Sequence, residues 1–249
     1  MKAFLAGASA LAVAVFNVAH AAPVDVDVEL QLLVDVSGSI SSSEFNLQRQ
    51  GYEDAFRSTQ VINAITGGDI GSVAVQMIYW SSDTLQQIAV DWTEVTDATS
   101  SNALADAIAA ASRPFGGSTG IEAAMDFGRP LFFSNDFNGT RLVQDVSGDG
   151  QDNEGGNPAA ARDAADAAGI TVNALPIGGS SITNYYANNV ATLDGFVLGA
   201  SGFDEFADAV RRKIFVEITD TEIPVPAPLL LMGSALAGFV GTKKRKAAK

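Results

Sequence analysis

Short apolar runs alternate with segments of helical periodicity along most of this chain. The apolar runs predict strands, and the amphipathic or Ala-rich segments between them predict helices. The expected strands cover residues 28–36, 71–80, 87–92, 141–146, 170–177 and 196–198, and the expected helices cover 42–59, 101–112, 119–127, 157–168 and 203–215. This alternation is typical of an α/β domain with helices on both faces of one sheet.

Local signals support several of these boundaries. Ser41 and Glu44 have the spacing of a capping box, and Asn157-Pro158 with Gly169 marks the beginning and end of a helix. The short turn after Trp80 predicts a hairpin, so the strand over 87–92 is expected to run antiparallel at an edge of the sheet. We therefore predict three layers around a mostly parallel central sheet with one antiparallel edge strand.

The N-terminal residues have the pattern of a secretory signal peptide. Lys2 precedes an apolar run over 4–18, and Ala19-His20-Ala21 forms a small-x-small cleavage site before Ala22. A buried first helix is the alternative, but no capping residue begins it. Residues 1–21 are therefore predicted to be removed, and Ala22 to be the first residue of the mature chain.

The C-terminus combines a Pro-rich segment, a short apolar run and a basic end. The run over 227–240 has 14 residues, fewer than the roughly 20 that span a bilayer comfortably, and a Lys/Arg cluster over 243–246 follows it. The arrangement resembles the C-terminal sorting signals that exosortases process in Gram-negative bacteria, although Val-Pro-Ala-Pro departs from their motifs. We expect a domain over 22–220 and, over 221–249, a hinge, a short transmembrane or sorting segment and a basic cytoplasmic tail. A permanent single-span anchor is the alternative.

Composition excludes several kinds of chemistry. The chain has no Cys, and its one His, His20, lies in the expected signal peptide. A mature chain without His or Cys has no Ser-His-Asp triad, no Cys-His nucleophile, no ordinary zinc site and no disulfide. Between Asp25 and Glu222, nine basic residues stand against 29 acidic ones, a net charge near −20. Nucleic acid is therefore a poor partner, and any bound metal must be held by oxygen.

Such oxygen donors gather where the first strand ends. Asp35-Val-Ser37-Gly-Ser39 places a carboxylate and two hydroxyls in one loop, and ligands collect at the carboxyl ends of parallel strands. These hard donors suit Mg²⁺, with Mn²⁺ or Ca²⁺ as alternatives. Two further polar loops, around Thr119 and around Asp149, fall at a helix start and after another strand.

These three loops, in this order, resemble the metal-ion-dependent adhesion site (MIDAS) of von Willebrand factor type A domains. The motifs around Tyr79-Trp80-Ser81, Trp92-Thr93, 146–150 and 175–177 further resemble a family of secreted, uncharacterised bacterial proteins of this fold. The resemblance implies hydroxyl ligands from Ser37, Ser39 and Thr119, with Asp35 and Asp149 binding directly or through water. Asp145 is expected to satisfy the loop backbone beside the site rather than bind the ion.

A calcium loop is the rival for the metal site. The sequence 145–150 copies the first half of an EF-hand loop, but Gly156 occupies the twelfth position, where the bidentate Glu is required.

For function, we expect a metal-dependent protein- or matrix-binding domain rather than an enzyme. It would contact a partner carboxylate at the outer surface or in the extracellular matrix of a Gram-negative bacterium, and would touch the membrane only through its C-terminal segment. The alternatives are a structural envelope or matrix protein with a vestigial site, and a magnesium-dependent hydrolase. The sequence has no Asp-x-Asp nucleophile motif and no Gly-Lys-Thr phosphate loop to support the hydrolase.

Overall fold

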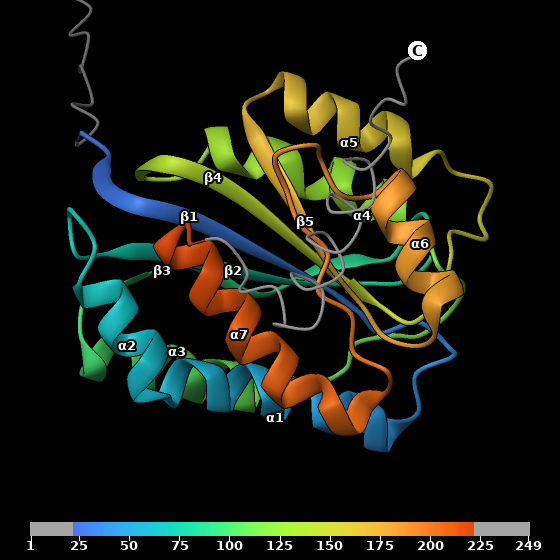
Figure 1. Cartoon of the computed structure of the whole chain (residues 1–249), viewed down its shortest axis with the longest axis horizontal. Coiled ribbons are helices and arrows are strands. Elements are labelled where there is room, and N and C mark those ends of the chain that lie inside the picture. The colour runs from blue at the N-terminus through green and yellow to red at the C-terminus, as the bar shows by residue number, and fades with distance from the viewer. Residues whose placement is uncertain (1–21, 222–249) are drawn as a thin grey trace, which may run out of the picture.

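Five of the apolar runs form the strands of a single sheet in the computed structural model, which describes residues 22–221 (Figure 1). The sheet order is β3-β2-β1-β4-β5; every neighbouring pair is parallel except β2 and β3. The predicted α/β fold, with one antiparallel edge strand, is therefore confirmed. The strands are β1 (Val24–Asp35), β2 (Val73–Trp80), β3 (Gln86–Val95), β4 (Phe137–Gly148) and β5 (Ile170–Pro176).

Helices cover both faces of this sheet. Figure 1 shows α1, α2, α3 and α7 on one face and α4, α5 and α6 on the other. The helices are α1 (Ser42–Arg57), α2 (Thr59–Thr66), α3 (Ala98–Ala110), α4 (Ile121–Gly128), α5 (Pro158–Ala167), α6 (Ser180–Asn189) and α7 (Phe206–Thr219), with 3₁₀ turns η1 (Arg129–Phe133) and η2 (Phe203–Glu205). No helix in the described residues is long and apolar enough to cross a membrane.

The central strand β1 separates two apolar cores. Leu30, Leu32 and Val34 pack into the core beneath α1 and α7, whereas Leu33 packs into the core beneath α4, α5 and α6. This alternation follows from the two-residue period of a strand. It also sends Asp35, the last residue of β1, toward the α4–α6 side, where the strands β1 and β4 end together.

The structure differs from the predicted elements in several places, and the helix α6 (Ser180–Asn189) has no predicted counterpart. The first strand begins at Val24 rather than at residue 28, because β1 continues to pair with the start of β4. The helix expected over 42–59 ends at Arg57, since the Ser58 side chain caps a second helix, α2. The strand expected over 196–198 is reduced to the isolated bridges Ala174–Val197 and Ile177–Ala200.

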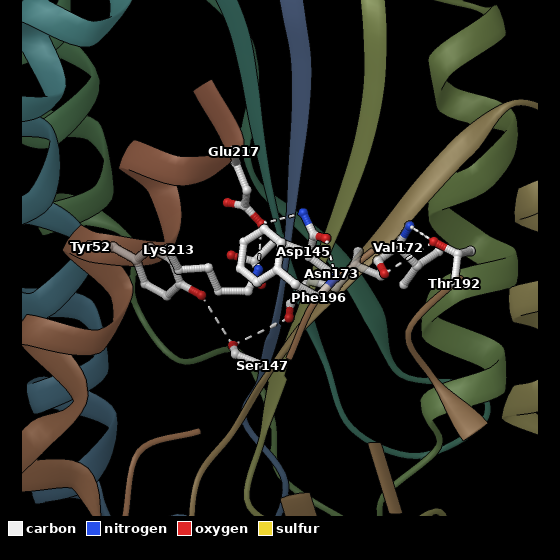
Figure 2. Close-up of polar contacts among 10 residues, drawn as sticks. Tyr52, Asp145, Ser147, Val172, Asn173, Thr192, Phe196, Lys213 and Glu217 are labelled. Atoms are coloured by element: carbon white, nitrogen blue, oxygen red, sulfur yellow. Dashed lines mark hydrogen bonds and ion pairs between the residues drawn. The ribbon is translucent and has the colours of Figure 1, made fainter. Parts of the chain in front are cut away.

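A buried ion cluster fastens α7 to the sheet (Figure 2). The ammonium of Lys213 lies 2.6 Å from Asp145 Oδ1 and also pairs with Glu217 one helical turn away, and all three side chains are fully buried. Asn173 of β5 donates to Glu217 Oε1 at 3.0 Å, and the ring of Phe196 lies 5.5 Å from the Lys213 ammonium. The cluster joins α7 to β4 and β5 through charges that water does not reach.

The position of Asp145 corrects two expectations from the sequence. Its carboxylate pairs with Lys213 on the α7 side, so it neither satisfies the backbone of the Asp149 loop nor faces the proposed metal. Residues 145–148 are also strand, paired with β1 and β5, rather than a loop that follows a helix. The EF-hand alternative therefore lacks its structural context.

Candidate metal site

The loop after β1 folds back on the carboxylate that ends the strand. The backbone N–H of Ser37 donates to Asp35 Oδ1 at 2.7 Å, and the hydroxyls of Ser37 and Ser39 lie 3.1 Å apart. Asp35 and Ser37 are buried, whereas Ser39 is exposed. The oxygen atoms of these three side chains therefore extend from the buried end of the sheet to the surface.

Backbone and side-chain hydrogen bonds on two sides fix the loop that carries Thr119 next to these residues. Gly38 N donates to Gly117 O at 2.7 Å, and Gly120 N donates to Ser81 O, at the end of β2, at 2.7 Å. On the far side, Thr119 N donates to Asn153 Oδ1 at 2.8 Å, and Asn153 N donates to Thr119 O. Thr119 itself is 4% exposed, so these bonds fix its backbone within the site.

Asp149, directly after β4, completes the group. Ser39 donates its hydroxyl proton to Asp149 Oδ1 at 2.7 Å. A Cβ on the next residue, Gly150, would lie 3.4 Å from Thr119 Oγ1, so the Asp149 loop passes close to the threonine hydroxyl. The structure thus brings together the five residues proposed from the sequence: Asp35, Ser37, Ser39, Thr119 and Asp149.

The electrostatics of Asp35 suit a cation. Burial, the largest effect, and the nearby Asp149 charge raise the pKa of Asp35 from 3.8 to about 7, against the opposing hydrogen bonds from Ser37. Oδ2 of Asp35 is buried and has no hydrogen-bond partner among the described residues. A divalent cation would offset the cost of burying the ionised Asp35 carboxylate, because an adjacent positive charge favours the ionised form.

The donor set also fits a hard cation rather than a soft one. The described residues contain no cluster of three or more His, Cys, Asp or Glu side chains that could hold a metal. Any cation here would therefore depend on the serine and threonine hydroxyls as well as on Asp35 and Asp149. Such oxygen donors suit Mg²⁺, Mn²⁺ and Ca²⁺.

Sequence reasoning missed several residues that support the site. Arg113 donates to the backbone carbonyls of Val36 and Ser37, at 2.8 and 2.7 Å, and so binds the first loop to the second. Asn153 holds the Thr119 backbone, and the buried Tyr186 of α6 lies under the site. No local motif marks these residues, because each acts through contacts between segments distant in the sequence.

The chain has the fold of von Willebrand factor type A-like domains. Proximal thread matrix protein 1 of the mussel byssus superposes with a TM-score of 0.61 at 18% identity, over 80% of this chain and 50% of that one. A type A domain from Catenulispora acidiphila gives a TM-score of 0.56 at 14% identity, over 80% and 44%. The pilus adhesin SpaC of Lactobacillus rhamnosus GG gives 0.53 at 18% identity, over 80% and 30%.

At sequence level the chain belongs to the family DUF1194, described as "Protein of unknown function", whose model matches residues 25–222. A search of curated proteins finds no significant match. The chain covers only about half, or less, of the length of these three structures, and the low identities establish the shared fold alone.

Proposed function

We propose that this domain binds an extracellular protein or matrix polymer through a divalent cation, and that it is not an enzyme. The observation that carries the proposal is the meeting of Asp35, Ser37 and Ser39 with Thr119 and Asp149 at the carboxyl end of the sheet. The mussel matrix protein has also been crystallised "with zinc occupied MIDAS motif", and the SpaC structure is that of an adhesin. Both proteins support the same kind of role here.

The hydroxyls of Ser37, Ser39 and Thr119 would hold the ion, with Asp35 and Asp149 binding directly or through water. Mg²⁺ is the preferred ion, with Mn²⁺ or Ca²⁺ as alternatives. When bound, the cation would act as a local Lewis acid that attracts a partner carboxylate. Ser39 and Asp149 give the site access to solvent, so a partner can reach it without a conformational change in the core.

The charge of the domain explains why a cation is needed for this contact. A net charge near −20 repels acidic partners, but mobile ions screen that repulsion beyond about 8 Å at physiological ionic strength. At contact distance the metal would therefore decide the interaction. Moderate salt should leave such binding largely intact, while chelation should remove it.

Substitution of Ser37 and Ser39 together by alanine should abolish partner capture. Both hydroxyls lie at the centre of the proposed site, and their loss leaves the cation with too few oxygen donors. The test is capture of envelope and matrix components from the producing bacterium on the immobilised mature protein, with Mg²⁺, with chelator, and with Mg²⁺ restored.

The matched control is Ser42→Ala/Ser43→Ala, two exposed serines at the start of α1. This variant should capture the same components as the wild type. Capture that persists under chelation and in Ser37→Ala/Ser39→Ala would refute metal-dependent adhesion and favour a structural role with a vestigial site.

We further propose that the protein is exported and sorted to the cell surface. The signal peptide over 1–21 and nearly all of the segment over 221–249 lie outside the described residues, and the domain boundaries of 22–220 stay a prediction. Intact-mass measurement of the native surface or secreted protein should show a chain that begins at Ala22 and lacks the residues after about Pro226. A mass that includes Lys249 would instead indicate a permanent anchor.

A further inference from the structure

A buried tyrosine hydroxyl without a partner lies directly under the candidate metal site. Tyr186 is fully buried on α6, on the same side of the sheet as Asp35, and its hydroxyl makes no hydrogen bond with any described residue. Leaving a buried hydroxyl unpaired costs roughly 1–3 kcal/mol. A phenylalanine would fill the same space without that cost, so packing alone does not explain the hydroxyl.

The hydroxyl shares a small space with the one unpaired oxygen of Asp35. A Cβ built on Gly148, the last residue of β4, would lie 2.4 Å from the Tyr186 hydroxyl and 2.8 Å from Asp35 Oδ2. Both oxygens therefore border the region that the glycine leaves free of a side chain. Tyr186 is a proton donor and Asp35 Oδ2 is an acceptor, and neither has another partner among the described residues.

The surroundings keep Tyr186 protonated. Burial, followed by the nearby charges of Asp35 and Asp149, raises the pKa of Tyr186 well above its ordinary value. The phenol is therefore a hydrogen-bond donor at neutral pH.

We propose that Tyr186 is a positioning residue of the metal site, whose hydroxyl donates to Oδ2 of Asp35, directly or through one water molecule, when the cation is bound. The hydrogen bond would hold the Asp35 carboxylate in the orientation that the cation requires. Hydrogen-bonding partners of this kind commonly change metal affinity by about 10–100-fold. The inference rests on the proposed metal site, and it adds a residue that the MIDAS resemblance does not include.

The test is Tyr186→Phe in the full mature chain, with MgCl₂ as the titrant in calorimetry. We expect Mg²⁺ affinity to fall by about tenfold or more, while the metal-free protein is as stable as the wild type or more stable, because an unpaired buried hydroxyl has been removed. Tyr79→Phe is the matched control. Its hydroxyl is also buried and unpaired, but it lies in the core on the opposite face of the sheet, so its removal should leave Mg²⁺ affinity unchanged.

Absorption spectroscopy gives a readout that a purely structural role would not change. Saturating Mg²⁺ should change the tyrosine absorption band of the wild type and of Tyr79→Phe. In Tyr186→Phe, most of that change should be absent. Loss of metal-free stability in Tyr186→Phe would overturn the proposal, because it would show that the hydroxyl already makes a structural hydrogen bond.

Asp35→Ala separates the two proposals. If Asp35→Ala abolishes Mg²⁺ binding and Tyr186→Phe leaves it unchanged, the metal site stands and the role of Tyr186 is refuted. If neither substitution changes Mg²⁺ binding, the proposed metal site itself is wrong.

Discussion

Replacement of Asp35 by asparagine should abolish divalent-cation binding and, in the absence of metal, stabilise the protein at neutral and higher pH. Asparagine keeps the shape of the side chain but removes the buried charge that the cation would neutralise. Calorimetry should therefore detect no Mg²⁺ binding to Asp35→Asn, and Asp35→Ala should behave in the same way. The wild type at a hundredfold excess of Mg²⁺ over its dissociation constant should gain about 2.7 kcal/mol in its free energy of unfolding.

The direction of the pH effect follows from the raised pKa of Asp35. In the metal-free folded protein this pKa is about 7, against an ordinary value of 3.8, so between these values the folded state binds more protons than the unfolded state. The free energy of unfolding therefore falls as the pH rises from about 4 to about 7. A shift of this size corresponds to a loss of about 4 kcal/mol, and Asp35→Asn should remove that part of the pH dependence.

Urea denaturation at several pH values, with chelator and with Mg²⁺, measures this effect. Asp83→Asn is the matched control, because Asp83 is an exposed aspartate in the neighbouring β2–β3 turn. It should leave both Mg²⁺ affinity and pH dependence unchanged. Equal Mg²⁺ affinity in the wild type and Asp35→Asn would show that the cation binds elsewhere.

Much of the fold could be predicted because each strand and helix carries its own periodic signal. The runs that became β2 and β5 are almost continuously apolar, as buried strands require, and Asn157 caps α5 as its sequence indicates. The break at Ser58 could not be predicted in the same way, since the residues on either side of it continue a helical pattern. Hydrogen bonds of the Ser58 side chain and backbone decide that boundary.

The residues of the candidate site also differ in how far the sequence predicts them. Asp35, Ser37, Ser39, Thr119 and Asp149 lie in loops that a parallel sheet must bring to one end, so motif and topology together predict that they meet. Asp145 and Tyr186 are different, because their surroundings depend on how α7 and α6 pack against the sheet. The sequence gives no local sign that Lys213 will pair with Asp145 across 68 positions.

Replacement of Lys213 by methionine should destabilise the protein by about 3–5 kcal/mol. Methionine has a similar length but no charge, so the substitution leaves Asp145 and Glu217 buried without their cation. Removal of one partner from a buried ion pair is usually this costly because the remaining charge cannot be hydrated. Arg212→Met, at the exposed neighbouring position on α7, is the matched control and should change the free energy of unfolding by less than about 0.5 kcal/mol.

The carboxyl groups predict how that loss depends on pH and on further substitution. Burial raises the pKa of Asp145, and burial with the Asp145 charge raises that of Glu217 to about 7, even with Lys213 present. Without the lysine both groups should stay protonated to still higher pH, so Lys213→Met should be least destabilising near pH 4 and increasingly destabilising as the pH rises.

A triple variant removes all three charges of the cluster: Lys213→Met/Asp145→Asn/Glu217→Gln. It should recover most of the stability that Lys213→Met loses at pH 8, because that loss comes from unpaired charge rather than from lost packing. Urea denaturation of the two variants at both pH values distinguishes these causes, since a packing defect would be independent of pH and would persist in the triple variant.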